Sequence, residues 1–202
     1  NQKNLVRKEK FLSGPTVESA VIIPFKTKKT LKNPSLKGNF LIAQNLLRQF
    51  QYDASPVSEL FKIDQLARFY ALVNLGRSWH PLRWHNERFY YDPVSSKLEI
   101  IAFDCYTTAD LEKTKAYFSP ELIILSNKFS YDRYLGYSPF NDQKFVNAYV
   151  KAVDEYLYKD FIATYLETNA SELDSLNQLI KKEYLGYNYN PAPLINDKEE
   201  VV

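Results

Sequence analysis

Two side chains with hard oxygen atoms lie at the two ends of a predicted β-hairpin. Asn86 stands just before the first strand, which we expect over residues 88–91. Asp104 directly follows the second strand, which we expect over residues 97–103. Because a hairpin brings its two ends together, the Asn86 amide and the Asp104 carboxylate should be neighbours. Mg²⁺ prefers such oxygen ligands, and phosphoryl-transfer enzymes use them to hold nucleotide phosphates.

The hairpin prediction depends on a change of pattern between Arg88 and Phe103. Residues 88–91 are rich in aromatic side chains, which favour strands, and the Asp-Pro-Val-Ser-Ser run that follows is typical of a turn. Apolar residues then recur along the second predicted strand, at Leu98, Ile100, Ile101 and Phe103.

Helical spacing prevails before and after the hairpin. From Leu36 onward, apolar residues recur at the helical period, at Phe40, Ala43, Leu47 and Phe50. A second helix is predicted to begin with Asp64 as its N-cap and to stop at Gly76. A long helix is predicted over residues 143–166.

Two weaker signals complete the expected elements. Val21–Phe25 predicts a short strand ended by Pro24, and Ser171 with Asp174 matches a capping pattern before a last helix. Helices on both sides of one small hairpin predict an α+β domain that is mostly helical.

Composition sets broad limits on the function. The chain has 202 residues, of which 45% are hydrophobic and 25% charged, and a formal charge of +2. These values suit one globular domain and predict no strong field for nucleic acid or a membrane surface. No apolar run approaches the roughly 20 residues of a transmembrane segment. A single cysteine, Cys105, excludes an internal disulfide.

Cys105 and the two histidines suggest two other kinds of site. His80, His85 and Cys105 are zinc-ligand types, although the spacing of the histidines is not the i, i+4 pair of a helical site. Cys105, His85 and Asn86 are the residue types of a thiol hydrolase. The alternative is that His85 packs beneath the hairpin, that Trp79 and Trp84 are core residues, and that Cys105 is inert packing.

The segment from Ile63 to Asp104 resembles the CotH (spore-coat-kinase) family, a divergent branch of the protein-kinase-like fold. The residues that carry the resemblance are KIDQLARFYALVNL and WHPLRWHNERFYYDPVSSKLEIIAFD, and the later FVNAYVKAVDEYL and LNQLIKKEYLGY also fit. The resemblance implies one domain over residues 1–187, clearest over 36–187, which represents the large C-terminal lobe of a kinase. Residues 188–202 are expected to form an extended or disordered tail.

The resemblance also implies roles for single residues. Asn86 matches the metal-binding Asn of the catalytic loop, and Asp104 matches the Asp that holds Mg²⁺ on the phosphates of ATP. The implied reaction is phosphorylation of Ser or Thr in a protein partner, and the family tends to lie in spore coats, envelopes or at cell surfaces.

Two departures from the family pattern keep a second interpretation open. Residues 74–85 contain no Asp or Glu to act as the catalytic base, so either the base is lost or His80 or His85 replaces it. The five glycines are scattered and cannot form a phosphate-covering loop, so the small nucleotide lobe is expected to be missing or lost. The alternative function is a pseudokinase scaffold that binds a protein partner without catalysis.

Overall fold

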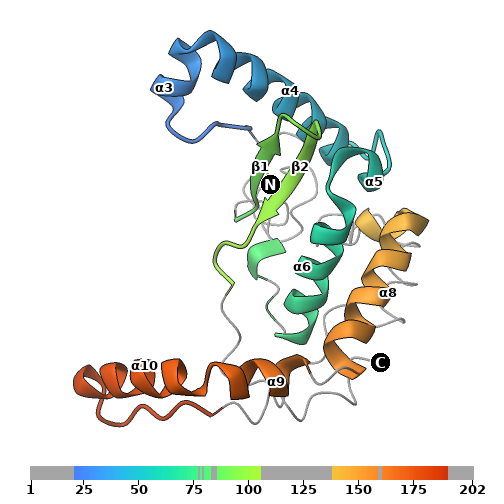
Figure 1. The fold of residues 1–202 in the computed structure, drawn as a ribbon. Helices are drawn as coiled ribbons and strands as arrows, with labels where there is room; N and C mark the ends of the chain where they lie inside the picture. The colour runs from blue at the N-terminus through green and yellow to red at the C-terminus, as the bar shows by residue number, and fades with distance from the viewer. Residues whose placement is uncertain are drawn as a thin grey trace, which may run out of the picture.

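The computed structural model describes residues 21–76, 78, 80–82, 86–105, 138–158 and 161–190, and these form a mostly helical α+β fold (Figure 1). The one sheet in these segments has two strands. The elements in chain order are α3 (Thr27–Lys32), α4 (Pro34–Gln51), α5 (Val57–Leu60), α6 (Ile63–Leu75), η1 (His80–Leu82), β1 (Arg88–Asp92), β2 (Lys97–Ile101), η4 (Ser138–Asn141), α8 (Gln143–Tyr158), α9 (Phe161–Thr168) and α10 (Ala170–Glu183).

The centre of the core is the packing of α6 against α8, with aromatic rings between them. The Phe145 ring is fully buried and lies 5.3 Å from Tyr70 and 5.0 Å from Phe140, both edge to face. Edge-to-face pairs at these distances add about 0.5–1.5 kcal/mol each beyond the burial of their area. The buried Asn74 amide donates a 3.0 Å hydrogen bond to the Tyr149 hydroxyl, which links the same two helices.

The hairpin is attached to the start of α6 by backbone, apolar and ionic contacts. The Lys62 N–H donates to the Leu98 carbonyl at 2.9 Å, and the Phe61 ring packs 5.7 Å from Phe89. The Lys62 ammonium group bridges Asp92, at 2.8 Å, and Glu99. Hydrogen bonds to these carboxylates raise the pKa of Lys62, and the Lys62 ammonium in turn holds the pKa of Asp92 below its usual range.

The short helix α5 is held at both ends by side chains from distant segments. At its start, the Ser58 N–H donates to Asp142 Oδ2 at 2.8 Å, while Asp142 Oδ1 accepts from the Lys144 N–H of α8 at 2.9 Å. At its end, the Lys97 ammonium donates to the carbonyls of Ser58, at 2.9 Å, and Glu59. One carboxylate therefore caps two helices, and one ammonium group satisfies carbonyls that a helix leaves unpaired.

Several expectations from sequence are confirmed, including the mostly helical α+β class. The helix predicted from Leu36 is α4, and the strands predicted at residues 88–91 and 97–103 are β1 and β2, although β2 ends two residues early, at Ile101. Gly76 ends α6 as predicted, but as a right-handed C-cap and not in the left-handed conformation.

Other expectations are wrong. Val21 to Pro24 is not a strand, because no described strand lies beside it to accept its hydrogen bonds. Asp64 lies in the first turn of α6, whose N-cap is Lys62. The long helix over residues 143–166 is two helices, α8 and α9, which run in different directions (Figure 1).

The capping pattern of Ser171 and Asp174 is also wrong, because α10 begins at Ala170 with Asn169 as N-cap, and both residues lie inside the helix. Of the expected tail over residues 188–202, only 188–190 belong to the described structure, and they have no regular secondary structure.

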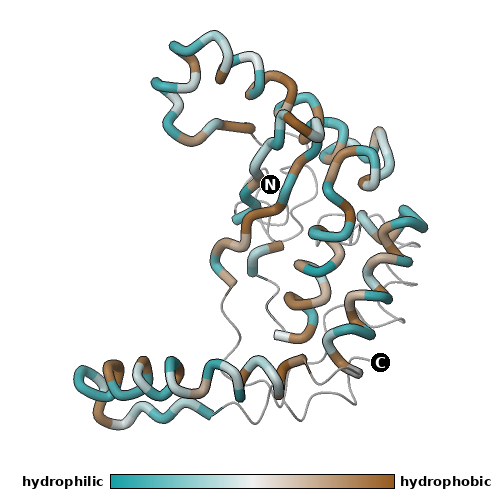
Figure 2. Tube along the Cα trace, viewed as in Figure 1, coloured by the Kyte–Doolittle hydropathy of each residue, from teal (hydrophilic) through white to brown (hydrophobic). Residues whose placement is uncertain are grey.

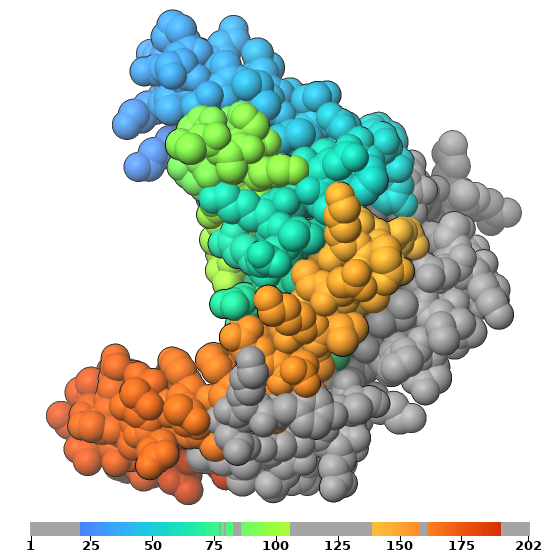
Figure 3. Space-filling view, turned by 45° about the vertical axis from the view of Figure 1, so that its right-hand side comes forward, coloured from blue at the N-terminus to red at the C-terminus, as the bar shows by residue number. Residues whose placement is uncertain are grey.

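Two arms extend from this core, and the hydropathy of their chains is mixed (Figure 2). The first consists of α3 and the start of α4, and the second of α9 and α10. In the space-filling view, the blue N-terminal arm and the red α10 arm stand on either side of a hollow (Figure 3). Among the described residues, no helix combines the length and the apolar character that crossing a bilayer requires.

Candidate active site

The open end of the hairpin carries both residues predicted to be neighbours. β1 and β2 pair antiparallel, and the pair at this end joins Arg88 to Ile101. Asn86 lies two residues before Arg88, and Asp104 lies three residues after Ile101. The Asn86 amide donates a 2.9 Å hydrogen bond to Asp104 Oδ2. The predicted proximity of this amide and this carboxylate is confirmed.

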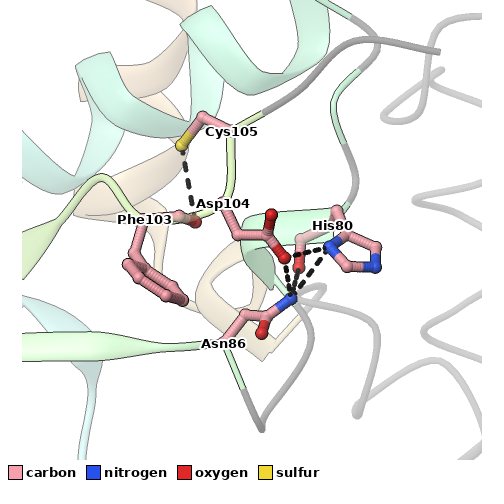
Figure 4. A network of polar contacts seen from close by, with 5 residues as sticks. All are labelled: His80, Asn86, Phe103, Asp104 and Cys105. Carbon is pink, nitrogen blue, oxygen red and sulfur yellow. Dashed lines mark hydrogen bonds and ion pairs between the residues drawn. The ribbon is translucent and has the colours of Figure 1, made fainter.

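His80 is the third member of this polar network (Figure 4). His80 Nδ1 lies 2.6 Å from Asp104 Oδ2 and 2.9 Å from Asn86 Nδ2, and Asn86 Nδ2 also donates to the His80 carbonyl at 3.1 Å. The turn η1 holds His80 in place, because its next two residues, Pro81 and Leu82, are buried. Three segments that are separate in the sequence thus meet at one point.

One arrangement of protons gives the ring hydrogen and both amide hydrogens an oxygen acceptor, and leaves His80 Nδ1 and Asn86 Nδ2 as two neighbouring donors 2.9 Å apart. A hydrogen on His80 Nδ1 donates to Asp104 Oδ2, and the two amide hydrogens of Asn86 donate to Asp104 Oδ2 and to the His80 carbonyl. This assignment follows from the network, since hydrogens are placed by their partners. It places the lone pair of the imidazole on Nε2, which makes Nε2 the basic nitrogen of His80.

Asn86 is buried, whereas the side chains of His80 and Asp104 are partly open to solvent. Asn86 is 7% exposed, whereas the side chains of His80 and Asp104 are 26% and 36% exposed. The buried amide therefore fixes the positions of its two neighbours, while a ligand can reach the imidazole and the carboxylate.

The segment that carries Asp104 is positioned by its neighbours. The Arg88 guanidinium lies 4.6 Å from the centre of the Phe103 ring, a cation–π contact between β1 and the residue before Asp104. Asp104 itself has a φ of 57°, a left-handed conformation that Asp adopts more readily than most residues. This turn directs the carboxylate to Asn86 and His80.

The donor atoms of Asn86 and Asp104 fit the chemistry of Mg²⁺. Within the described structure, Asp104 uses Oδ2 in the network and Asn86 uses Nδ2, so each side chain retains one hard oxygen, Oδ1. Mg²⁺ commonly binds one or two protein oxygens together with water and substrate phosphates. These two oxygens point to different sides of the network in Figure 4, so their atom types suit Mg²⁺ but they do not converge on one metal position in this arrangement.

Glu87 carries a carboxyl group next to the site in sequence, just outside the range 74–85 in which a catalytic base was expected. It directly follows Asn86 and is partly buried, and removal of its carboxyl from water raises its pKa to about 8. Its place beside Asn86 could have singled it out from sequence, but its raised pKa depends on burial, which the sequence does not give.

The zinc and thiol-hydrolase alternatives gain no support. No group of three or more His, Cys, Asp or Glu side chains in the described segments is arranged to hold a metal ion. The Cys105 thiol is exposed, so the prediction that it is inert packing is wrong. It lies 3.7 Å from the Phe103 carbonyl, and partial burial raises its pKa. His85, Trp79 and Trp84 lie outside the described residues.

No protein-family model, curated protein or solved structure matches this chain.

Proposed function

We propose that this chain carries a kinase-like phosphoryl-transfer site of the CotH type, with His80 as the general base toward a Ser or Thr hydroxyl of a protein. The observation that supports it most is the meeting of His80, Asn86 and Asp104 at the open end of the hairpin. His80 lies six residues before Asn86, close to where a kinase catalytic loop has its Asp, five residues before its Asn.

In the proposed reaction, His80 Nε2 accepts the proton of the acceptor hydroxyl as that oxygen attacks. Asp104 Oδ2 holds the imidazole through Nδ1 and stabilises the imidazolium that forms, as an Asp does for a catalytic His in other enzymes. Asn86 keeps the Asp104 carboxylate and the His80 backbone at a fixed separation. Chemistry at this site therefore requires all three residues.

The proposal assigns the remaining oxygens to a metal–nucleotide complex. Asp104 Oδ1 would hold Mg²⁺, which would neutralise the phosphate charge of a bound ATP, and Asn86 Oδ1 would join it only after the amide turns away from its present hydrogen bonds. Asp104 then has two roles, through its two carboxylate oxygens, and its loss should remove both nucleotide binding and turnover.

A scaffold without catalysis is the second candidate function, and the glycine content favours it. The chain has five glycines, Gly14, Gly38, Gly76, Gly136 and Gly186, none close to another in sequence. Without a Gly-rich loop to cover the phosphates, these 202 residues by themselves should bind ATP weakly. In that case the site residues would be kept for structure, and the chain would act by binding a protein.

Calorimetric titration of the purified chain with Mg-ATP tests the first function. We expect binding that disappears in Asp104→Ala and persists in His80→Gln, because His80 is assigned to proton transfer and not to the nucleotide. Turnover, followed as transfer of labelled phosphate to casein, should fall about 10²–10⁴-fold in His80→Gln. Asp154→Ala, an exposed carboxylate on α8, is the matched control and should change neither quantity.

Two results would reject the kinase-like proposal. One is the absence of Mg-ATP binding by a chain that is folded by circular dichroism, which would favour the scaffold. The other is binding that is unchanged in Asp104→Ala, which would place the nucleotide elsewhere.

A further inference from the structure

Although the net charge of the chain is small, positive charge is concentrated in one segment near its N-terminal end. The first arm and the segment that precedes it, together residues 21–42, form what we call the basic arm. It carries five lysines, and no acidic residue occurs from residue 19 to residue 52. Because the whole chain carries +2, the residues outside the basic arm together carry −3. A local field around the arm is therefore positive although the molecule is almost neutral.

The five lysines of the basic arm are not used within the described structure. No described side chain forms an ion pair or hydrogen bond with the ammonium groups of Lys26, Lys28, Lys29, Lys32 or Lys37. By contrast, Lys62 and Lys97, near the core, each contact two acceptors. The ammonium groups of the arm are therefore available to an external anion.

Large apolar side chains of the same arm are also exposed to solvent. Val21 is 77% exposed, and Ile23 and Phe25 are each 66% exposed. Further exposed apolar residues follow along α3 and the start of α4, at Leu31, Leu36, Leu41 and Ile42. Single exposed apolar residues are ordinary, but here seven occur within 22 residues, on the same segment as the five lysines.

The core holds the basic arm in position. The second half of α4 packs partly buried side chains against the core, at Ala43, Leu46, Leu47 and Phe50. The first half continues the same helix beyond the hairpin, and α3 packs against it (Figure 1). In Figure 3 the arm stands out from the body at the blue end of the molecule. The exposed surface is thus presented by a helix that is fixed at its other end.

We propose that the basic arm binds the surface of an anionic lipid bilayer. Lysines near such a surface each strengthen binding about fivefold, and apolar side chains can enter the boundary between headgroups and acyl chains. Lysines and exposed apolar residues occur together along the arm, and the boundary of an anionic bilayer offers charged headgroups and acyl chains to both kinds of side chain at once. A nucleic-acid backbone would attract the lysines but would leave the aliphatic side chains in water.

Sedimentation with lipid vesicles tests this proposal on the full chain. We expect binding to phosphatidylcholine vesicles that contain about one third phosphatidylserine, weak binding to pure phosphatidylcholine, and a loss of affinity as salt is raised. Replacing three lysines of the arm should reduce the affinity roughly 100-fold. The variant is Lys28→Gln/Lys29→Gln/Lys32→Gln.

A variant of equal net charge is the control. Three exposed lysines on α8 and α10, changed as Lys144→Gln/Lys151→Gln/Lys182→Gln, should leave the affinity within about threefold of the unmodified chain, because they lie outside the arm. Entry of the apolar side chains is tested with Phe25→Trp, whose fluorescence should shift to shorter wavelength on anionic vesicles.

Four results would overturn the proposal. The first is that the chain does not bind anionic vesicles, and the second is that it binds neutral vesicles equally well. The third is that the two triple-lysine variants lose the same amount of affinity for anionic vesicles. The fourth is that the chain binds polyglutamate or DNA but not vesicles. The polyglutamate result would instead assign the arm to an acidic protein, and the DNA result to a nucleic acid.

Discussion

Removing the carboxylate of Asp142 should destabilise the fold more than its position near the surface suggests. Asp142 Oδ1 accepts from the Lys144 N–H of α8, and Oδ2 accepts from the Ser58 N–H of α5. Loss of a helix N-cap typically costs about 1 kcal/mol, and hydrogen bonds to charged groups contribute about 1.5–3 kcal/mol. For Asp142→Ala we therefore expect the free energy of unfolding to fall by about 2–3 kcal/mol.

The pH dependence of this effect has a definite sign. Partial burial of Asp142 opposes ionisation, but hydrogen bonds from Ser58, Lys144 and Phe145 hold its pKa below the usual range. A carboxyl whose pKa is lower in the folded state stabilises the fold above its unfolded pKa of about 4 and loses that effect as the pH falls through the folded pKa. The difference in the free energy of unfolding between Asp142→Ala and the unmodified chain should therefore become smaller at acidic pH.

Urea denaturation followed by circular dichroism, at neutral pH and at several acidic values, measures both quantities. Asp142→Asn keeps one acceptor oxygen and should lie between the unmodified chain and Asp142→Ala. Asp154→Ala, exposed on the same helix, should change the stability by less than about 0.5 kcal/mol. If Asp142→Ala is as stable as Asp154→Ala, or if its deficit does not vary with pH, the double-capping argument fails.

Four further changes test other parts of the structure, each by denaturant unfolding. Phe145→Ala empties a fully buried ring position and should lower the stability by about 3–5 kcal/mol. Tyr149→Phe removes the acceptor of the buried Asn74 amide and should lower it by about 1–2 kcal/mol. Ser96 lies in the hairpin turn with a left-handed φ of 55°, a conformation that glycine adopts without steric cost, so Ser96→Gly should raise the stability by about 0.5–1 kcal/mol. Burial raises the pKa of Glu87 to about 8 in the folded chain, so the unfolded chain loses this proton at lower pH and the free energy of unfolding falls between about pH 4 and pH 8. Glu87→Gln lacks this proton, so its stability relative to the unmodified chain should increase as the pH rises through that range.

Local patterns predicted the elements whose partners lie nearby in the chain. The apolar period of residues 36–50 indicated α4, and the turn at residues 92–96 indicated the pairing of β1 with β2. The same pairing led to the proximity of Asn86 and Asp104, because a hairpin fixes which residues share its open end.

Long-range contacts explain several of the errors. Asp64 is a good N-cap residue, but the hydrogen bond from Lys62 to Leu98 and the bridge between Phe61 and Leu98 hold the chain extended up to Lys62. These contacts with β2 set the start of α6. His80 was one of two histidines considered as a replacement base, and its contact with Asp104 could not be predicted, because it depends on a turn that no periodic pattern indicates.

The two distant supports of α5 have a consequence for the order of folding. Its first turn depends on Asp142, 84 residues away, and its last carbonyls depend on Lys97, 38 and 39 residues away. A four-residue helix is too short to persist without such help. We therefore expect α5 to form only after the hairpin and α8 have docked, so that changes at Asp142 or Lys97 accelerate unfolding and leave the folding rate nearly unchanged.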